Sequence, residues 1–276
     1  MKKRFIGIFM TMISLAVLGG CAGNSTESAS TAGQEEQQTD NLLEDIRERG
    51  TITIAMEGTW APWTYHDENG NLTGYDVEVG QLIAEKLGVE PDFVEGEWDG
   101  LLAGLDAGRY DIMINGVDVT EERQEAYDFS EAYAYNRTAV IVRGDNSDIR
   151  TMEDLEGKST ANTISSTYAE LAESYGANVT GVDDLNQTFE LLLSGRIDAT
   201  LNAEVTFYDY VEEHPEADVK IAVLTDEASE VAIPMRKGEA TADLRKAVNE
   251  AIGELRESGQ LTQLSEKYFG TDISQM

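Results

Sequence analysis

Residues 107–130 read AGRYDIMINGVDVTEERQEAYDFS, and the change from strand to helix within this stretch indicates the fold. Residues 111–115 (DIMIN) form a short apolar run that is typical of a buried strand, and Gly116 ends it. Thr120 is a favourable N-cap, because its hydroxyl can accept a hydrogen bond from a free amide of the first helical turn. The stretch therefore predicts a strand, a loop and a helix in close succession.

Arg123 follows in the first turn of this helix, beside the end of the preceding strand. Its planar guanidinium offers a fork of donors that matches the two oxygens of a carboxylate. Arg123 is therefore a candidate carboxylate-binding residue. The alternative is a surface arginine that pairs with Glu122 or Asp128.

Upstream of this stretch, strands expected at 51–56 and 89–94 alternate with helices at 74–87 and 98–107, after a first helix at 42–49. Alternation of strands and helices at this spacing predicts a parallel sheet with crossover helices.

The alternation restarts after residue 137, which predicts a second α/β unit. Ligands of open parallel sheets bind at the carboxyl ends of the strands. The expected strands lie at 138–142, 159–163, 197–202, 219–223 and 231–235, and the expected helices at 151–154, 165–175, 185–193, 204–213, 241–257 and 260–269.

The N-terminus has the pattern of an export signal. A basic start (MKKR) precedes an apolar run at 5–18, which is shorter than the roughly 20 residues of a spanning helix. Residues 18–21 (LGGC) resemble the lipobox of bacterial lipoproteins, which implies that Cys21 is diacylated and becomes the new N-terminus. The alternative is a buried or incidental cysteine. The polar segment 22–40 then predicts a flexible tether.

The composition excludes several partners. Without the three cations of the signal, the mature chain has 17 basic and 53 acidic residues and a net charge of −36. A nucleic-acid partner is excluded, because phosphate binding needs a basic face. Two histidines and a single cysteine argue against zinc, and no Walker-type phosphate loop is present. No cofactor or metal is expected.

Several short motifs follow one another in a specific order between residues 42 and 269. They resemble those of the family 3 (type II) extracellular solute-binding proteins of polar amino-acid ABC transporters. The motifs are GYD at 74–76 with Glu78, Trp98 with Leu101 and Leu105, GRYD at 108–111, TEER at 120–123, DFS at 128–130, DLEGK at 154–158, GRIDA at 195–199 and KYF at 267–269.

This resemblance implies a two-lobed periplasmic-binding-protein-like α/β fold, in which each lobe is a mostly parallel sheet flanked by helices and two hinge strands join the lobes. The hinges are expected near 133–137 and 228–232. The expected organisation is a lipoprotein signal peptide (1–20), an acylated cysteine and tether (21–41), a first lobe (42–132 plus 230–276) and a second lobe (138–226).

The implied function is that of a receptor, not an enzyme. It would be a monomer, held by its lipid anchor on the extracellular face of the cell membrane (Gram-positive type), that binds an amino acid and delivers it to an ABC transporter permease. Two alternatives share the fold: a ligand-sensing module, and a dehydratase-like enzyme in which Glu57 or Asp118 supplies the acid or base.

The resemblance also implies which residues hold the ligand's α-carboxylate. Arg123 matches the arginine that binds it. Thr163, Ser166 and Thr167 lie in a second-lobe loop whose hydroxyls and amides complete the carboxylate site. The hydroxyls can also cap the helix that follows, which is compatible with binding a carboxylate there.

Gly116 and Asp118 match positions that meet the α-amino group, through a carbonyl and a side chain. Many members add an aspartate after the GRIDA strand, but this chain has Ala203 there. Either Asp118 supplies the charge that an ammonium needs, or the ligand lacks a free amine. Asp118 can alternatively be a turn residue.

The remaining candidates surround the ligand side chain. Trp60 matches an aromatic lid and Trp98 the opposing wall, although both can be plain core. Glu57 matches a position that contacts the far end of the ligand, unless it is solvated. Asn202 is a further candidate that can alternatively cap the next helix. The ligand stays open between a flat or apolar, a cationic or amide, and a sulfur amino acid such as cystine.

Overall fold

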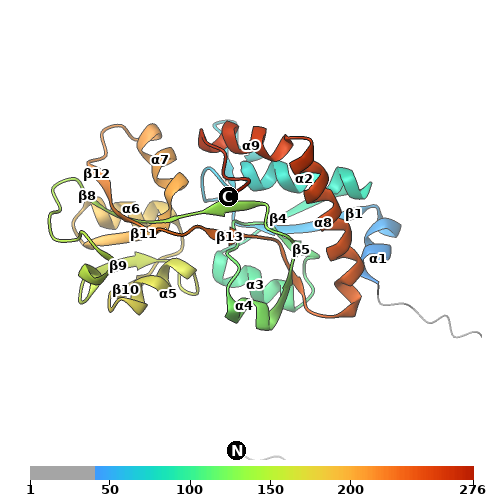
Figure 1. The fold of residues 1–276 in the computed structure, drawn as a ribbon, viewed down its shortest axis with the longest axis horizontal. Helices are drawn as coiled ribbons and strands as arrows, with labels where there is room; N and C mark the ends of the chain where they lie inside the picture. The colour runs from blue at the N-terminus through green and yellow to red at the C-terminus, as the bar shows by residue number, and fades with distance from the viewer. Residues whose placement is uncertain (1–40) are drawn as a thin grey trace, which may run out of the picture. The chain divides into compact units, whose positions relative to one another are not determined.

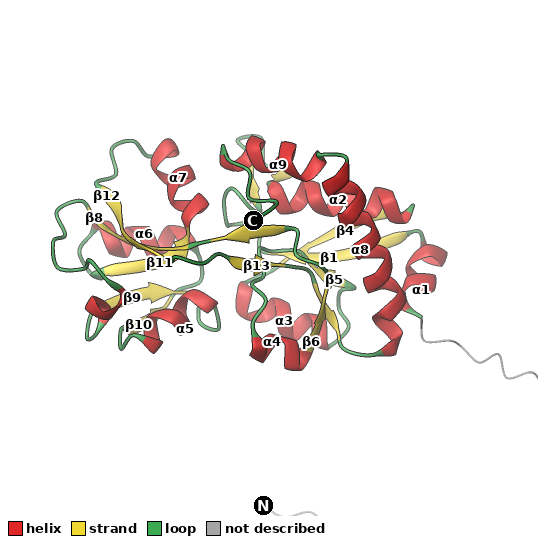
Figure 2. Cartoon of the chain, viewed as in Figure 1, coloured by secondary structure: helices red, strands yellow, loops and turns green. Residues whose placement is uncertain are grey.

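The computed structural model describes residues 41–276 (Figure 1). The expected signal peptide, Cys21 and the tether up to residue 40 lie outside the described residues. Within 41–276 the chain has the two-lobed α/β fold (Figure 2). None of the helices in this part of the chain combines the length and the apolar character needed to cross a membrane.

The first lobe is built on a parallel sheet in which β1 (Thr51–Met56) lies between β4 (Glu90–Glu95) and β5 (Ile112–Met113). Successive side chains of a strand point to opposite faces of the sheet, so β1 contributes Ile54 to one core cluster and Ala55 to another. The helices of this lobe are α1 (Leu42–Arg49), α2 (Tyr75–Leu87), α3 (Trp98–Asp106), α4 (Glu121–Ala126), η2 (Glu239–Thr241), α8 (Ala242–Glu257) and α9 (Gln260–Phe269).

Helices cover both faces of this sheet. Buried residues of α2, α8 and α9 pack in the cluster that contains Ile54, and these three helices lie together in Figure 1. Buried residues of α3 pack on Ala55. Thr120 caps α4 as predicted, because its hydroxyl accepts from the amide of Arg123 at 3.1 Å. Two small pairings complete the lobe: β2 (Tyr65–His66) with β3 (Leu72–Thr73), and β6 (Tyr127–Phe129) with β14 (Pro234–Arg236).

The second lobe has a five-stranded mixed sheet in the order β10-β9-β11-β8-β12. The strand β8 runs antiparallel to both of its neighbours, whereas β9 is parallel to β10 and β11. Buried residues of α6 and α7 pack on one face and those of α5 on the other. The elements are β8 (Thr138–Arg143), η1 (Met152–Leu155), β9 (Ser159–Asn162), α5 (Thr167–Ser174), β10 (Asn178–Gly181), α6 (Leu185–Leu193), β11 (Ala199–Ala203), α7 (Glu204–Glu213) and β12 (Val219–Leu224).

Two antiparallel strands, β7 (Ala134–Asn136) and β13 (Ser229–Val231), connect the lobes. Val231 also forms a bridge with Asp118, and the amide of Val119 donates to the carbonyl of Glu230 at 2.9 Å. The connection therefore contacts the loop in which the candidate residue Asp118 lies.

The structure corrects two local predictions and adds elements that were not predicted. The single strand expected at 231–235 is wrong: β13 ends at Val231 and β14 starts at Pro234, because the chain changes partner from β7 to β6. The helix expected from residue 165 starts at Thr167, because Ser165 has a left-handed φ of 62° and Ser166 is the N-cap. The strand β10 and the hairpin β2–β3 were not predicted.

Candidate functional site

A cavity lies between the lobes, and its empty space is about 550 Å³ when the opening to solvent is included. Strand ends and helix N-termini of both lobes line it, as expected for parallel α/β sheets. Every residue predicted to bind the ligand lines this one cavity: Glu57, Trp60, Trp98, Gly116, Asp118, Arg123, Thr163, Ser166, Thr167 and Asn202. Their contacts with a ligand stay a prediction.

Sequence reasoning missed five further lining residues. Asn162 is the last residue of β9, so the rule that selects strand ends would have found it. Asp184 is the N-cap of α6, and the sequence does not show that this end of the helix lies at the cavity. The five are Asn162, Tyr168, Asp184, Leu185 and Thr188.

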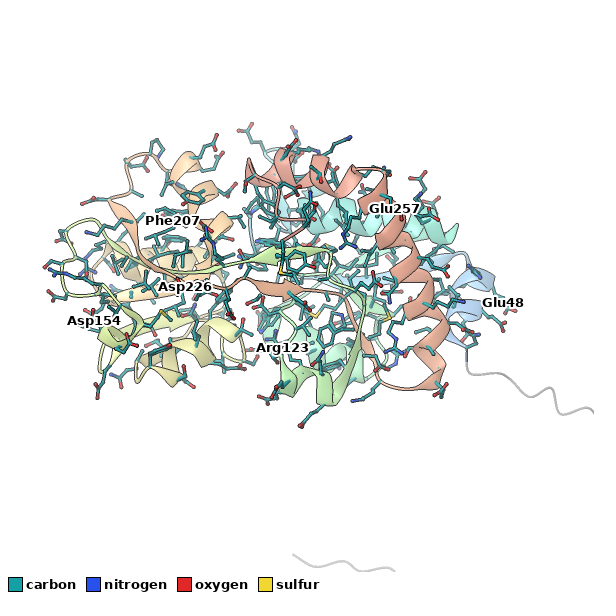
Figure 3. All side chains as sticks on the ribbon, in the orientation of Figure 1. Glu48, Arg123, Asp154, Phe207, Asp226 and Glu257 are labelled. Carbon is teal, nitrogen blue, oxygen red and sulfur yellow. The ribbon has the colours of Figure 1, made fainter. Side chains whose placement is uncertain are left out.

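Arg123 is only 8% exposed and lies where the two lobes meet (Figure 3). Its guanidinium donates to the carbonyl of Asp118 at 3.0 Å and, across the cavity, to the carbonyl of Ser165 at 3.2 Å. Its guanidinium carbon is 5.3 Å from the ring centroid of Trp98. These neutral partners hold the cation in place without neutralising it.

Among residues 41–276, Arg123 forms no ion pair. Asp128, one of the alternative partners, pairs instead with Arg245 at 3.3 Å. The surface-pair interpretation of Arg123 is therefore wrong. A buried cation is costly without an anion, so this position favours an anionic group from outside the chain.

The N-terminus of α5 lies beside Arg123 and offers free donors. Ser166 caps the helix by accepting from the amide of Ala169 at 3.1 Å. The amides of Thr167 and Tyr168 have no acceptor within the described part of the chain. Free amides at a helix N-terminus attract a carboxylate, so Arg123 and α5 together can hold one.

Asp118 is 6% exposed and shares this end of the cavity with Arg123. Its carboxylate accepts a 2.5 Å hydrogen bond from the hydroxyl of Thr167 in the second lobe. Burial raises the pKa of Asp118, while Thr167 and the Arg123 charge oppose this rise. Ala203 is fully buried and does not line the cavity, so Asp118 is the carboxylate available for an ammonium here.

Trp60 packs against Gly116 in the lining of the cavity. A β carbon on Gly116, whose φ is 55°, would lie 2.5 Å from the Trp60 ring, so this close approach requires glycine. Trp60 stacks on Trp63 with 5.4 Å between ring centroids. Its indole N–H donates at 3.2 Å to Asn202 Oδ1, which also accepts from the amide of Ala203. Trp60 and Asn202 therefore link the two lobes at the cavity.

Glu57 follows β1 and is half-buried, which contradicts the alternative of a solvated residue. Its carboxylate accepts from Asn115 Nδ2 at 2.7 Å, and its amide donates to Asn115 Oδ1 at 2.7 Å. Burial raises the pKa of Glu57 to about 7; Asn115 opposes this, and the negative charges of Asp184 and Asp99 add to it. A cation in the cavity would stabilise the ionised form.

Asp76 is a buried carboxyl group of α2 that does not itself line the cavity. It is fully buried, and it accepts a 2.8 Å hydrogen bond from the hydroxyl of Tyr133, which directly precedes β7. Its other oxygen, Oδ2, has no hydrogen-bond partner among the described residues. Burial raises the pKa of Asp76 to about 7. Asp76 thus holds Tyr133 next to a connecting strand.

Within residues 41–276, no cluster of three or more histidine, cysteine, aspartate or glutamate side chains is arranged to hold a metal ion.

The chain matches the family model of bacterial extracellular solute-binding proteins, family 3, over residues 52–271. It is 38% identical to the L-cystine-binding protein TcyA of Bacillus subtilis (strain 168), an alignment that covers 99% of this chain and 100% of TcyA. It is 40% identical to the L-cystine solute receptor of Neisseria gonorrhoeae, whose unliganded open structure gives a TM-score of 0.58 and is aligned over 86% of this chain and 99% of the receptor.

An ancestral arginine-binding protein bound to arginine is 34% identical and gives a TM-score of 0.75, over 80% of this chain and 99% of that protein. The open receptor is thus more similar in sequence but less similar in structure. The hydrogen bonds from Thr167 and Trp60 across the cavity agree with lobes that lie close together.

These proteins are named for the amino acid that they bind and not for a reaction. The family match spans most of the chain, and relatives match over nearly their whole length. The chain therefore belongs to the family 3 bacterial extracellular solute-binding proteins, and it is a binding protein and not an enzyme.

Proposed function

We propose that this protein is an extracellular receptor that binds L-cystine in the cavity between its lobes and delivers it to the permease of an ABC transporter. The observation that carries the proposal is Arg123, a buried cation that lines the cavity and forms no ion pair among residues 41–276. The cavity is thereby suited to a small ligand with a carboxylate.

The ligand's α-carboxylate binds between the Arg123 guanidinium and the free amides of Thr167 and Tyr168. A bidentate contact with an arginine is charge-assisted, and the helix N-terminus favours the negative charge. The α-ammonium binds Asp118 and the carbonyl of Gly116. The two head-group charges are thus met by side chains of opposite charge that lie next to each other.

Binding is coupled to closure of the lobes. Arg123 and Asp118 belong to the first lobe, whereas Thr167 and the Ser165 carbonyl belong to the second. A ligand that contacts both sets favours the closed arrangement, because the open arrangement loses one of them. The paired strands β7 and β13 are the segments able to absorb the rotation.

Sequence identity favours cystine over arginine, and the lining of the cavity agrees with such a ligand. The relatives named for L-cystine are 38% and 40% identical to this chain, and the arginine-binding one is 34% identical. The cavity also extends from Arg123 to Glu57, which suits a ligand with polar groups at both ends.

The anchor is Cys21. The lipobox-like LGGC at 18–21 and the polar segment that follows support attachment to the membrane by two acyl chains, which hold a protein more stably than one. The folded lobes would then lie on the extracellular face.

A thermal-shift screen tests the proposal. The panel contains the twenty amino acids, L-cystine and N,N′-diacetylcystine. A ligand at about 100 times its Kd adds about 2.7 kcal/mol to the free energy of unfolding, so L-cystine should raise the Tm clearly. Diacetylcystine has no free ammonium and should not. A panel in which L-cystine does not shift the Tm would contradict the proposal.

A further inference from the structure

The side chains that line the cavity include more carboxylates than cations. Its carboxylates are Glu57, Asp118 and Asp184, and the cation among its described lining residues is Arg123. In the proposed function, Arg123 and Asp118 hold the head group of the ligand. This leaves Glu57 of the first lobe and Asp184 of the second, and neither forms an ion pair within residues 41–276.

Glu57 and Asp184 are held by neutral donors. Glu57 accepts from Asn115 Nδ2 at 2.7 Å. Asp184 accepts from the backbone amide of Gln187 at 2.9 Å and from its side-chain amide at 3.2 Å. These contacts fix both carboxylates but leave their charge uncompensated. The two are close enough for the Asp184 charge to add to the effect of burial on the pKa of Glu57.

The side-chain oxygen of Asn162 is a second, independent observation, because it lacks a hydrogen-bond donor among the described residues. Asn162 lines the same cavity and is 3% exposed, and its Oδ1 accepts no hydrogen bond from any described residue. Its Nδ2 donates to the carbonyl of Leu201 at 2.7 Å, which identifies Oδ1 as the free acceptor. A buried oxygen without a donor costs about 1–3 kcal/mol, so an N–H group from a ligand would be stabilised there.

We infer that Glu57, Asp184 and Asn162 form a subsite for a cationic nitrogen, an ammonium or a guanidinium, at the end of the ligand remote from Arg123. The inference rests on the proposed function, which assigns Arg123 and Asp118 to the first head group. It defines the substrate class as amino acids with a second cationic nitrogen. L-Cystine and arginine both belong to this class. Ligands with a neutral or anionic far end bind more weakly, because two carboxylates face them.

Matched ligand pairs separate the second nitrogen from the rest of the ligand. The mixed disulfide of cysteine with cysteamine keeps the second ammonium of cystine and lacks its second carboxylate. The mixed disulfide of cysteine with 3-mercaptopropionate does the reverse. Arginine and citrulline form a second pair of almost equal shape. Calorimetry should show the cationic member of a pair binding at least about tenfold more tightly to the wild type.

Two variants assign this preference to the subsite. Glu57→Gln and Asp184→Asn each remove one charge with little change in shape, and asparagine caps a helix as well as aspartate does. Asp183→Asn is the matched control, because it removes an exposed carboxylate next to Asp184. The preference should fall several-fold in both test variants, with the affinity for citrulline unchanged, and should persist in the control.

Three outcomes are decisive. If the cationic members bind the wild type no better than their partners, or do not bind, the inference is overturned. It is also overturned if both test variants keep the preference, or if they weaken all ligands equally. If L-cystine does not bind but arginine is preferred over citrulline and the variants abolish this preference, the cystine proposal fails and the subsite stands.

Discussion

The hydroxyl of Thr167 in the second lobe donates a 2.5 Å hydrogen bond to the Asp118 carboxylate in the first lobe. This bond joins the N-terminus of α5 to the loop that follows β5, where the Arg123 guanidinium also contacts the Asp118 carbonyl. Asp118 therefore contacts the second lobe and is also the proposed partner of a ligand ammonium.

Asp118→Asn should weaken binding of L-cystine by roughly 2–5 kcal/mol, because the variant leaves a buried ammonium without a charged partner. Calorimetry on the wild type and the variant measures the effect. Normal binding by Asp118→Asn would contradict the ammonium assignment and redirect the search to N-acylated ligands.

The affinity for L-cystine should rise as the pH increases from about 5 to about 7, a range in which the ammonium groups of cystine stay protonated. Burial raises the pKa of Glu57 to about 7, and a ligand cation would lower it by favouring the ionised form. Binding below pH 7 should therefore release protons. The neighbouring charges are Asp99, Asp184, Asp118 and Arg123.

Calorimetry in buffers with different ionisation enthalpies counts the protons released. Glu57→Gln should bind with a smaller pH dependence and release fewer protons. If the variant keeps the full slope of the wild type, another group is responsible and the link to Glu57 is lost.

Asp76 should make the folded protein more stable at acidic than at neutral pH. Burial raises its pKa from 3.8 to about 7, so between these values the folded state keeps a proton that the unfolded chain has lost. This contribution is present at low pH and is lost as the pH rises to about 7. The Tm of Asp76→Asn relative to wild type should therefore increase between about pH 5 and about pH 7.5.

The amide side chain of this variant would keep an oxygen for the hydroxyl of Tyr133, so that hydrogen bond need not be lost with the charge. Asp92→Asn, which alters an exposed carboxylate of β4, is the control and should show no such trend. A Tm difference between Asp76→Asn and wild type that stays constant with pH would rule out this titration.

Cys21→Ser should release the protein from the membrane without changing its affinity for L-cystine, because two acyl chains on Cys21 are the proposed anchor. Fractionation of cells and calorimetry of the released protein measure the two properties. A serine variant that stays in the membrane fraction would show that the anchor lies elsewhere.

Helices with local signals at both ends could be predicted closely from the sequence. The helices α1 and α6 have the bounds expected for them, because a capping side chain (Asn41 or Asp184) precedes each helix and a glycine (Gly50 or Gly195) follows it. The edge strand β10 could not be predicted, because the strand (NVTG) is short and most of its residues are exposed. The division of residues 229–236 into β13 and β14 depends on a change of pairing partner, which no local pattern encodes.

The candidate site was predictable where a residue's place follows from a strand end or a family motif. Arg123 and Asp118 are of this kind. Asp184 was missed because the sequence does not show that the N-terminus of α6 lies at the cavity. The bond between Trp60 and Asn202 was also beyond the sequence, since it depends on how the two lobes approach each other.

Isothermal titration of L-cystine into wild type and Arg123→Ala tests the central claim most directly. Removing one partner of a buried charge pair costs roughly 3–5 kcal/mol, so the variant should bind at least about a hundredfold more weakly. Arg109→Ala removes an exposed arginine and should bind like wild type. An Arg123→Ala variant that remains folded and binds L-cystine within about threefold of the wild-type Kd would contradict the claim that Arg123 holds the ligand carboxylate.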